Sequence, residues 1–513
     1  MEGPEIAKDD YGDFPILRNS TTSLKPGCQA EQNARYPLVK NGQIREFGTL
    51  LNQSVEFRSL KSLLASIMKK PIISVSGLRG IIGETLAPPI AMQYVAAFAA
   101  SLPPGPIVVT RDGRATGQML AGAIASALMA VGRNVEYGDV AATPTTGVLV
   151  RDLDAAGGVQ ISASHNPPEY NGIKLFGTDG RVIGAQAGQK VIDALESETA
   201  WVTHDRLGSQ EVIEDTIGKH LDLVSDTVDV ELIRNKNFSV VLDSNHGAGS
   251  VMAHRMLTDL NCKAVIVGDT PDGLFAHPPE PTADNLQTIS PLAGLHKADV
   301  VFCQDPDADR LAIIDEHGNY IGEEYTLALT MKRRLMQETG DCVINCATSR
   351  MSIDIAESFG CQCHLSAVGE ANVCDLMQSV NAVYGGEGNG GPIDPKVGYV
   401  RDSFVAMSQV LELMAITGKS VSELVAEIPA YSIHKAKSSV SRDKLPAIYD
   451  ALRQKFSDAK ANDQDGLRFD WDDRWLLIRP SNTEPIVRII CETNDEKAST
   501  DLASEAASVI DSA

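Results

Sequence analysis

The sequence predicts an α/β protein of several domains that ends in a smaller α+β domain. A chain of 513 residues is too long for one core, and domains of about 100 to 150 residues suggest three or four of them. Along most of the chain, strand-like apolar runs alternate with helix-like stretches, as in α/β layers with mostly parallel strands. The end differs, because two strands around a polar turn precede a closing helix, at 474–478, 486–491 and 498–510.

Apolar runs rich in Val and Ile predict the strands of the α/β part, and alanine-rich or periodic stretches predict its helices. The strands are placed, in chain order, at 71–75, 106–110, 159–161, 238–243, 298–302, 311–314 and 342–346. The helices are placed at 60–70, 119–131, 251–257 and 353–359.

Domain boundaries are weakly marked in the sequence. The first 55 residues are polar and lack a sustained period, which predicts a mobile N-terminal extension that we take as residues 1–67. Boundaries near 218, 320 and 428 then divide the rest into four parts. These predicted domains are 68–218, 219–320, 321–428 and 429–513.

Charge and composition exclude several classes of protein. A formal net charge of −23 argues against a nucleic-acid-binding protein, because neutralising phosphates needs a basic face. A few Arg and Lys in a cleft can still bind a small anion. No apolar run approaches the roughly 20 residues of a membrane span. Nine scattered cysteines and the lack of a signal-peptide pattern predict a reduced, cytoplasmic protein.

The first notable loop follows the strand at 159–161 and contains Ser164 and His165 before Asn166-Pro167-Pro168. The Gly-x-Ser-x-Gly pattern of hydrolases is absent here. Adjacent Ser and His side chains on an extended backbone also point in different directions. A displayed serine and an ordinary surface turn are equally compatible with these residues alone.

The second loop places Asp305, Asp307 and Asp309 at alternate positions between two apolar strands. Three carboxylates in a tight turn offer the oxygen ligands that Mg²⁺ or Ca²⁺ accepts. An EF-hand is disfavoured because Arg310 stands where that loop needs glycine. Arg310 can instead hold a phosphate beside the cation, whereas a solvated acidic turn is the plain alternative.

Two later loops have weaker signals. Five glycines surround Glu387 and Asn389 in the segment 385–391, so that backbone and carboxylate can approach a ligand, and Glu387 can accept two sugar hydroxyls. A flexible loop explains this segment equally well. Arg479-Pro-Ser-Asn-Thr-Glu-Pro485, followed by Arg488, supplies a guanidinium fork, hydroxyls and turn amides for a phosphate, or else is an ordinary hairpin loop.

In this order the four loops resemble those of the α-D-phosphohexomutases, the superfamily of phosphoglucomutase, phosphomannomutase and phosphoglucosamine mutase. The resemblance extends from residue 71 to about 495. It implies an isomerase with four domains around a central cleft, three similar α/β mixed-sheet domains and then a smaller α+β domain. Each domain would contribute one loop to the cleft.

The resemblance also implies roles for individual residues. Ser164 would carry the phosphoryl group, and Ser164, Asp305, Asp307 and Asp309 would bind Mg²⁺. The reaction would pass through a hexose 1,6-bisphosphate, which also activates the enzyme. Arg79, His165, Lys174 and Arg310 would lie near the serine, with Lys174 as the favoured general acid or base. Glu387 and Asn389 would bind the sugar hydroxyls. The phosphate of the substrate that is not reacting would be bound by Arg479, Ser481, Asn482, Thr483 and Arg488.

The preferred sugar is suggested by Glu370, which follows Val368-Gly369 as in phosphoglucosamine mutases. A carboxylate there can pair with a substrate ammonium, which favours glucosamine phosphate over the mannose or glucose phosphates. The partner is therefore a small phosphosugar, not a nucleic acid or a membrane, and the enzyme is expected to be a monomer or homodimer. A metal-dependent phosphatase or a non-catalytic sugar-phosphate sensor is a remote alternative.

Overall fold

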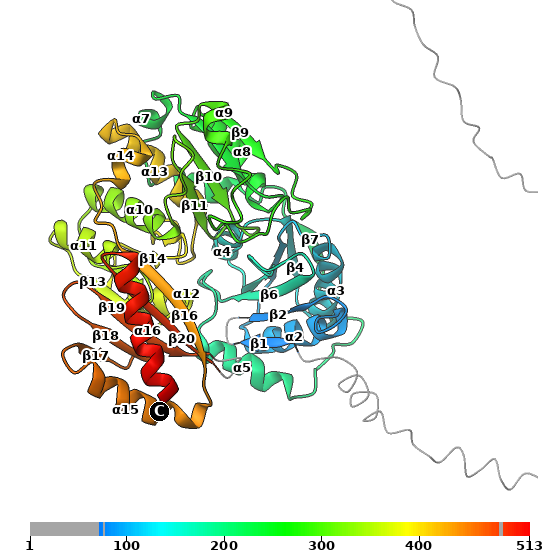
Figure 1. Cartoon of the computed structure of the whole chain (residues 1–513). Coiled ribbons are helices and arrows are strands. Elements are labelled where there is room, and N and C mark those ends of the chain that lie inside the picture. The colour runs from blue at the N-terminus through cyan, green and yellow to red at the C-terminus, as the bar shows by residue number, and fades with distance from the viewer. Residues whose placement is uncertain (1–70, 75–76, 482–485, 513) are drawn as a thin grey trace, which may run out of the picture. The chain divides into compact units, whose positions relative to one another are not determined.

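The first part of the chain folds into a seven-stranded mixed sheet with helices packed on it (Figure 1). The computed structural model describes residues 71–74, 77–481 and 486–512. The sheet order is β1-β2-β6-β5-β3-β4-β7. Its strands are β1 Ile72–Ser74, β2 Gly77–Ile81, β3 Ile107–Arg111, β4 Val135–Val140, β5 Gly157–Ile161, β6 Tyr170–Phe176 and β7 Gln210–Val212; its helices are α2 Pro88–Ser101, α3 Gly117–Ala130, α4 Thr143–Asp152 and α5 Ala185–Leu195.

The second part contains a four-stranded sheet in the order β11-β10-β8-β9. The strands β8, β10 and β11 are nearly all apolar and largely buried, as the sequence pattern predicts, whereas the edge strand β9 is exposed or half-buried. Its elements are α6 Gly218–Ser225, α7 Val230–Arg234, β8 Ser239–Asp243, α8 Gly249–Asp259, β9 Lys263–Val267, α9 Leu292–His296, β10 Val300–Gln304 and β11 Leu311–Ile314.

The third part repeats this arrangement in a sheet of order β13-β12-β14-β15. Its long helix, which contains residues 403–417, is buried over nearly its whole length. The elements are α10 Glu323–Gln337, β12 Cys342–Asn345, α11 Met351–Ser358, β13 Cys363–Ser366, α12 Glu370–Val380, β14 Tyr384–Glu387, β15 Gly391–Ile393, α13 Ser403–Thr417 and α14 Val421–Val425.

The last part is an antiparallel five-stranded sheet, β16-β20-β19-β18-β17, on which α16 packs across β16 and β20 (Figure 1). This confirms the predicted α+β end of the chain. The elements are β16 Ser432–Ser439, the short helix Arg442–Lys444, α15 Leu445–Lys455, β17 Lys460–Asn462, β18 Leu467–Asp470, β19 Trp475–Pro480, β20 Ile486–Thr493 and α16 Glu496–Ser512.

The first three sheets share one strand pattern, although the sequence shows no residue-level repeat. In each, three parallel strands are followed by an antiparallel partner that pairs with the last of them. The turns of these hairpins are the serine loop between β5 and β6, the aspartate loop between β10 and β11, and the glycine loop between β14 and β15. The predicted α/β class with three similar mixed-sheet domains is therefore confirmed.

Two contacts bring these hairpins together. The second and third parts share one hydrophobic core, in which Leu242 and Phe302 lie in the same cluster as Leu327 and Phe404. Leu311 N also donates to the carbonyl oxygen of Gly390 at 2.8 Å, so that the aspartate loop adjoins the glycine loop.

A buried chain of hydrogen bonds links helices from the first three parts. Thr145 Oγ1 lies 2.8 Å from His220 Nδ1, and His220 Nε2 lies 2.7 Å from Asp402 Oδ2. Asp402 also caps α13 by accepting from the backbone N–H groups of Phe404 and Val405. We call these three residues the Thr145–His220–Asp402 link. Within the described ranges, no helix is long and apolar enough to cross a bilayer.

Candidate active site

Ser164 occupies the turn between β5 and β6 with a left-handed backbone, at a φ of 51°. This conformation is unfavourable for a residue other than glycine and persists only where neighbours hold it. Ser164 N donates to Ser162 Oγ at 2.8 Å, and Ser162 Oγ donates to Asp112 at 2.7 Å. The hydroxyl of Ser164 donates to Asp305 Oδ2 at 2.9 Å.

Arg114 holds the backbone of the serine loop. Its guanidinium is almost completely buried and pairs with Asp112 at 3.1 Å. The same group donates to the carbonyl oxygens of Ser164 at 2.6 Å, Asn166 at 2.5 Å, Pro167 at 2.7 Å and Tyr170 at 3.1 Å. We call this arrangement the Arg114 cage, since its four carbonyls fix the turn that presents Ser164.

The three aspartates of the β10–β11 turn are fully buried, and one oxygen from each lies within 4.8 Å of the others. Asp305 accepts a hydrogen bond from the hydroxyl of Ser164. Lys174 Nζ donates hydrogen bonds to Asp307 at 2.5 Å and to Asp309 at 2.8 Å. Thr143 Oγ1 donates to Asp307 as well.

The chemistry of this set fits a divalent cation. Asp307 Oδ1 and Asp309 Oδ1 are buried and have no hydrogen-bond partner among the described residues. Unpartnered buried carboxylate oxygens are costly unless a cation takes them. Among the residues that the structure describes, this is the cluster that can hold a metal ion.

Lys174 and His165 have opposite protonation tendencies. Burial lowers the pKa of Lys174, but the carboxylates of Asp307 and Asp309 outweigh it and raise the pKa above its ordinary value. Burial, with the charges of Arg310 and Arg79, lowers the pKa of His165 to about 3. His165 Nδ1 lies 3.3 Å from Ser164 Oγ, so the serine hydroxyl has an imidazole beside it. The amine of Lys174 is held by the aspartates of the neighbouring turn.

The glycine loop places Glu387 at the end of β14, where it is held by three donors. Asn345 Nδ2 and Gly369 N donate to Oε1 at 2.8 and 3.1 Å, and Arg401 Nη1 donates to Oε2 at 2.7 Å. The side-chain oxygen of Asn389 is buried without a partner among the described residues, which suits a ligand hydroxyl.

A cavity of about 540 Å³, lined by several charged side chains, lies among these groups. Its size is typical of a small-molecule site. All four parts of the chain contribute to it, and its lining includes Arg79, Lys174, Arg310, Glu370, Glu387, Asn389, Arg401, Arg479 and Arg488. The structure thus brings eight of the predicted site residues to one cavity, and Lys174 in its lining contacts Asp307 and Asp309 of the buried aspartate turn.

The phosphate loop predicted after β19 is only partly described. Arg479 and Arg488 line the cavity, and Arg479 Nε pairs with Asp465 Oδ2 at 2.8 Å. Ser481 is buried at the end of the strand, where its N–H donates to Ile486 O at 2.9 Å. Asn482 and Thr483 lie outside the described residues.

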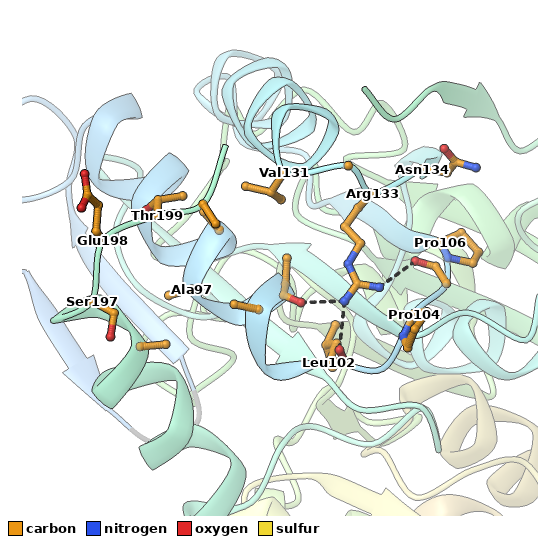
Figure 2. Close-up of a pocket in the computed structure, with 17 residues that line it drawn as sticks. Ala97, Leu102, Pro104, Pro106, Val131, Arg133, Asn134, Ser197, Glu198 and Thr199 are labelled. Atoms are coloured by element: carbon orange, nitrogen blue, oxygen red, sulfur yellow. Dashed lines mark hydrogen bonds between the residues drawn. The ribbon is translucent and has the colours of Figure 1, made fainter. Parts of the chain in front are cut away.

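A larger cavity, of about 730 Å³, lies within the first domain and has a different chemistry. Small or apolar residues, alanine above all, make up most of its lining, and Arg133 is the one basic residue there (Figure 2). Its guanidinium donates to the carbonyl oxygens of Ala99, Leu102, Pro103 and Gly105, at the end of α2. The guanidinium of Arg133 is therefore already hydrogen-bonded to the backbone. The cluster of charged side chains that could bind a ligand lies in the smaller cavity.

Sequence reasoning missed Arg401 and the role of Arg114. Arg401 is buried and contacts Asp309, Glu370 and Glu387. Burial lowers its pKa, but these three carboxylates raise it well above its ordinary value. The sequence holds one signal, because Asp402 before an apolar periodic run predicts a helix start. That signal places Arg401 at a helix N-terminus but does not predict its partners.

Comparison with known proteins agrees with this geometry. Four sequence models of the phosphoglucomutase/phosphomannomutase family match in order: α/β/α domain I at 71–201, α/β/α domain II at 219–318, α/β/α domain III at 322–431 and the C-terminal domain at 437–509.

Full-length relatives are similar as well. A phosphoglucomutase/phosphomannomutase of Thermococcus kodakarensis is 35% identical over 434 residues, which are 82% of this chain and 94% of the relative. A "probable phosphoglucosamine mutase" of Methanosarcina acetivorans is 32% identical, over 82% of this chain and 95% of the relative. The crystal structure of a phosphoglucomutase/phosphomannomutase family protein of Burkholderia thailandensis superposes with a TM-score of 0.74 at 24% identity, over 86% of this chain and 98% of that one. The chain therefore belongs to the phosphoglucomutase/phosphomannomutase family of α-D-phosphohexomutases, whose members are isomerases.

Proposed function

We propose that this phosphohexomutase interconverts hexose 6-phosphates and hexose 1-phosphates through phosphorylated Ser164 and a bisphosphorylated sugar. One contact carries this proposal: Ser164 Oγ lies 2.9 Å from Asp305, at the turn where three buried aspartates meet. A serine hydroxyl held against a cation-binding cluster, two residues from Ser162 in the lining of a cavity rich in arginine, is suited to phosphoryl transfer.

Asp305, Asp307 and Asp309, with Ser164, would hold Mg²⁺. When bound, this ion would neutralise charge that develops on the moving phosphoryl group. The chain's own cations add to that effect, because Arg79, Arg310 and Lys174 line the same cavity.

In the proposed first half-reaction, the bond between phosphorus and Ser164 Oγ breaks and a bond from phosphorus to the free O1 or O6 of the sugar forms. The sugar hydroxyl loses a proton, and Ser164 Oγ regains one. Lys174 and His165 are the proposed proton-transfer residues, because His165 Nδ1 lies 3.3 Å from Ser164 Oγ and Lys174 lines the cavity where the sugar would bind.

The second half-reaction needs the bisphosphate to present its other phosphate to Ser164. Arg479 and Arg488 from the last domain line the cavity, where guanidinium groups can hold the phosphate that is not reacting. We propose that Ser481, Asn482 and Thr483 assist them. Glu387 and Asn389 would bind the sugar hydroxyls in both orientations.

Two sugar classes remain as candidates. Glucosamine phosphate is supported by relatives named for phosphoglucosamine mutase, such as that of Methanosarcina acetivorans. Glucose and mannose phosphates are supported by the contact between Glu370 and Arg401, because the carboxylate expected to bind an ammonium already has a cationic partner. The cytoplasmic location and the monomeric or dimeric state stay predictions.

Replacement of Ser164 by Ala tests the proposal. With glucose 1,6-bisphosphate supplied, Ser164→Ala should lose mutase turnover by at least a thousandfold, because no group remains to carry the phosphoryl between substrates. Exposed Ser197, in the other cavity, provides the control, and Ser197→Ala should keep the wild-type kcat/KM. Turnover above one tenth of wild type in Ser164→Ala would overturn the assignment.

A further inference from the structure

Arg401 occupies the part of the cavity where the sugar is expected, and it joins three acidic residues from different elements. Nη1 donates to Glu387 Oε2 and Nη2 to Asp309 Oδ2, each at 2.7 Å. Glu370, at the start of α12, is the third. No other described arginine contacts both the aspartate loop and the glycine loop.

Both oxygens of Glu370 face Arg401. The backbone N–H of Arg401 donates to Oε1 at 2.8 Å, and the guanidinium Nη2 lies 3.6 Å from Oε2. Glu370 also lines the cavity. Its carboxylate is therefore part of the proposed sugar site and is also paired with the guanidinium of Arg401.

The position of Arg401 is firmly set by its neighbours. A Cβ at Gly391 would lie 2.3 Å from Arg401 Cδ, which shows that the aliphatic stem rests directly on the glycine loop. The following residue, Asp402, caps α13 and is bonded to His220. A side chain packed against backbone and followed by a cap has little freedom to move aside for a ligand.

A mixed guanidinium–carboxylate site distinguishes a hydroxyl from an ammonium. A sugar hydroxyl can donate to a carboxylate and accept from a guanidinium, whereas an ammonium can only donate. An ammonium would also stand beside Arg401 and Lys174, which line the same cavity and carry like charge. The chain thus contains a cation that competes with a charged amino sugar for Glu370.

We propose that Arg401 is a specificity residue that directs this site toward hexose phosphates with a neutral hydroxyl and against glucosamine phosphate. The inference rests on the proposed mutase function and deepens it by naming the substrate class. Arg401 acts by occupying Glu370, so its removal should make that carboxylate available to an ammonium.

The experiment compares kcat/KM for glucosamine 6-phosphate with kcat/KM for glucose 6-phosphate in the full-length enzyme primed with glucose 1,6-bisphosphate. Arg401→Met should raise the ratio of glucosamine to glucose use at least tenfold, whereas Arg401→Lys, which keeps the charge, should stay within threefold of wild type. Adding Glu370→Gln to Arg401→Met should remove the gain.

Arg334→Met is the matched control. Arg334 is a buried arginine that pairs with Asp394 and Glu338 outside the cavity, so its loss should leave the ratio unchanged. An active Arg401→Met enzyme with an unchanged ratio would overturn the proposal.

Glu370→Gln alone provides a second measurement that does not depend on how well Arg401→Met folds. In the presence of Arg401 this isosteric change should alter the ratio less than threefold, since Glu370 is already paired. A tenfold loss of glucosamine use would overturn the proposal, because it would show that Glu370 binds the ammonium despite Arg401. Failure of the mutase function itself would appear differently, as wild-type enzyme without turnover of either sugar.

Discussion

At the scale of single residues, Ser164 depends on neighbours that are not among the proposed catalytic or substrate-binding residues. Its left-handed backbone is held by Ser162 and by the Arg114 cage. The motif around Ser164 is visible in the sequence, but the four carbonyl contacts of Arg114 are not, because its partners lie 50 to 56 positions away. The resemblance of short motifs therefore predicts Ser164 as the phosphoryl carrier, and tertiary contacts show which residues hold it in place.

Arg114→Lys should reduce kcat at least tenfold while leaving substrate KM within threefold. A lysine ammonium keeps the charge but cannot reach four carbonyls from one plane, so the serine turn would lose its fixed geometry. Steady-state kinetics with glucose 1-phosphate measure the effect.

Arg133→Lys is the matched control for Arg114→Lys, since Arg133 also donates to four carbonyls but lies at the other cavity. It should lower the thermal midpoint and leave kcat unchanged. Equal losses of kcat in both variants would show that Arg114 affects only folding.

At the scale of elements, the buried strands are the best predicted part of the fold. The apolar runs at β3, β8, β10 and β12 match the predicted strands within a few residues. β15 was not predicted, because the three residues Gly391–Ile393 include glycine and proline, which disfavour strands. The equivalence of the three hairpins was also inaccessible from residue patterns, since strand pairing is set by contacts distant in sequence.

A pH-dependent contact fixes the loop after β9 onto the end of β8. His277 Nε2 lies 2.8 Å from Asp243 Oδ2. Burial lowers the pKa of His277, but its hydrogen bond to Asp243 and that residue's charge outweigh burial and raise the pKa above its ordinary value. The folded state therefore binds the proton more tightly than the unfolded chain does.

The stabilisation from His277 should be complete below a pH of about 6.5, the ordinary histidine pKa, and should disappear as the pH rises through the raised value. His277→Gln should accordingly lower the thermal midpoint more at pH 5.5 than at pH 9. Calorimetric scans of both proteins at the two pH values test this. A difference that is constant across the range would contradict the prediction.

At the scale of the whole molecule, the site exists only where the four parts of the chain meet. The sequence identified one loop from each part, and the resemblance implied that they share a cleft, which the cavity lining supports. Arg401 escaped prediction because its three acidic partners come from three separate elements. Asp402 in the sequence could have indicated the start of α13, but no sequence pattern indicates the charges around Arg401.

Divalent cation should stabilise the whole molecule, because binding to the folded state alone shifts unfolding by mass action. Mg²⁺ at a hundred times its dissociation constant should add about 2.7 kcal/mol, seen as a higher thermal midpoint than in excess EDTA. Asp307→Asn should abolish the Mg²⁺-dependent rise. An equal rise in wild type and variant would place the stabilising cation elsewhere.

The Thr145–His220–Asp402 link has a further consequence for how the first three domains stay joined. A carboxylate oxygen of Asp402 faces one ring nitrogen of His220, and the hydroxyl of Thr145 faces the other. All three residues are buried, so moving one of these parts independently of the others would leave polar atoms unpaired inside the protein. The link therefore couples the orientations of the serine, aspartate and glycine hairpins.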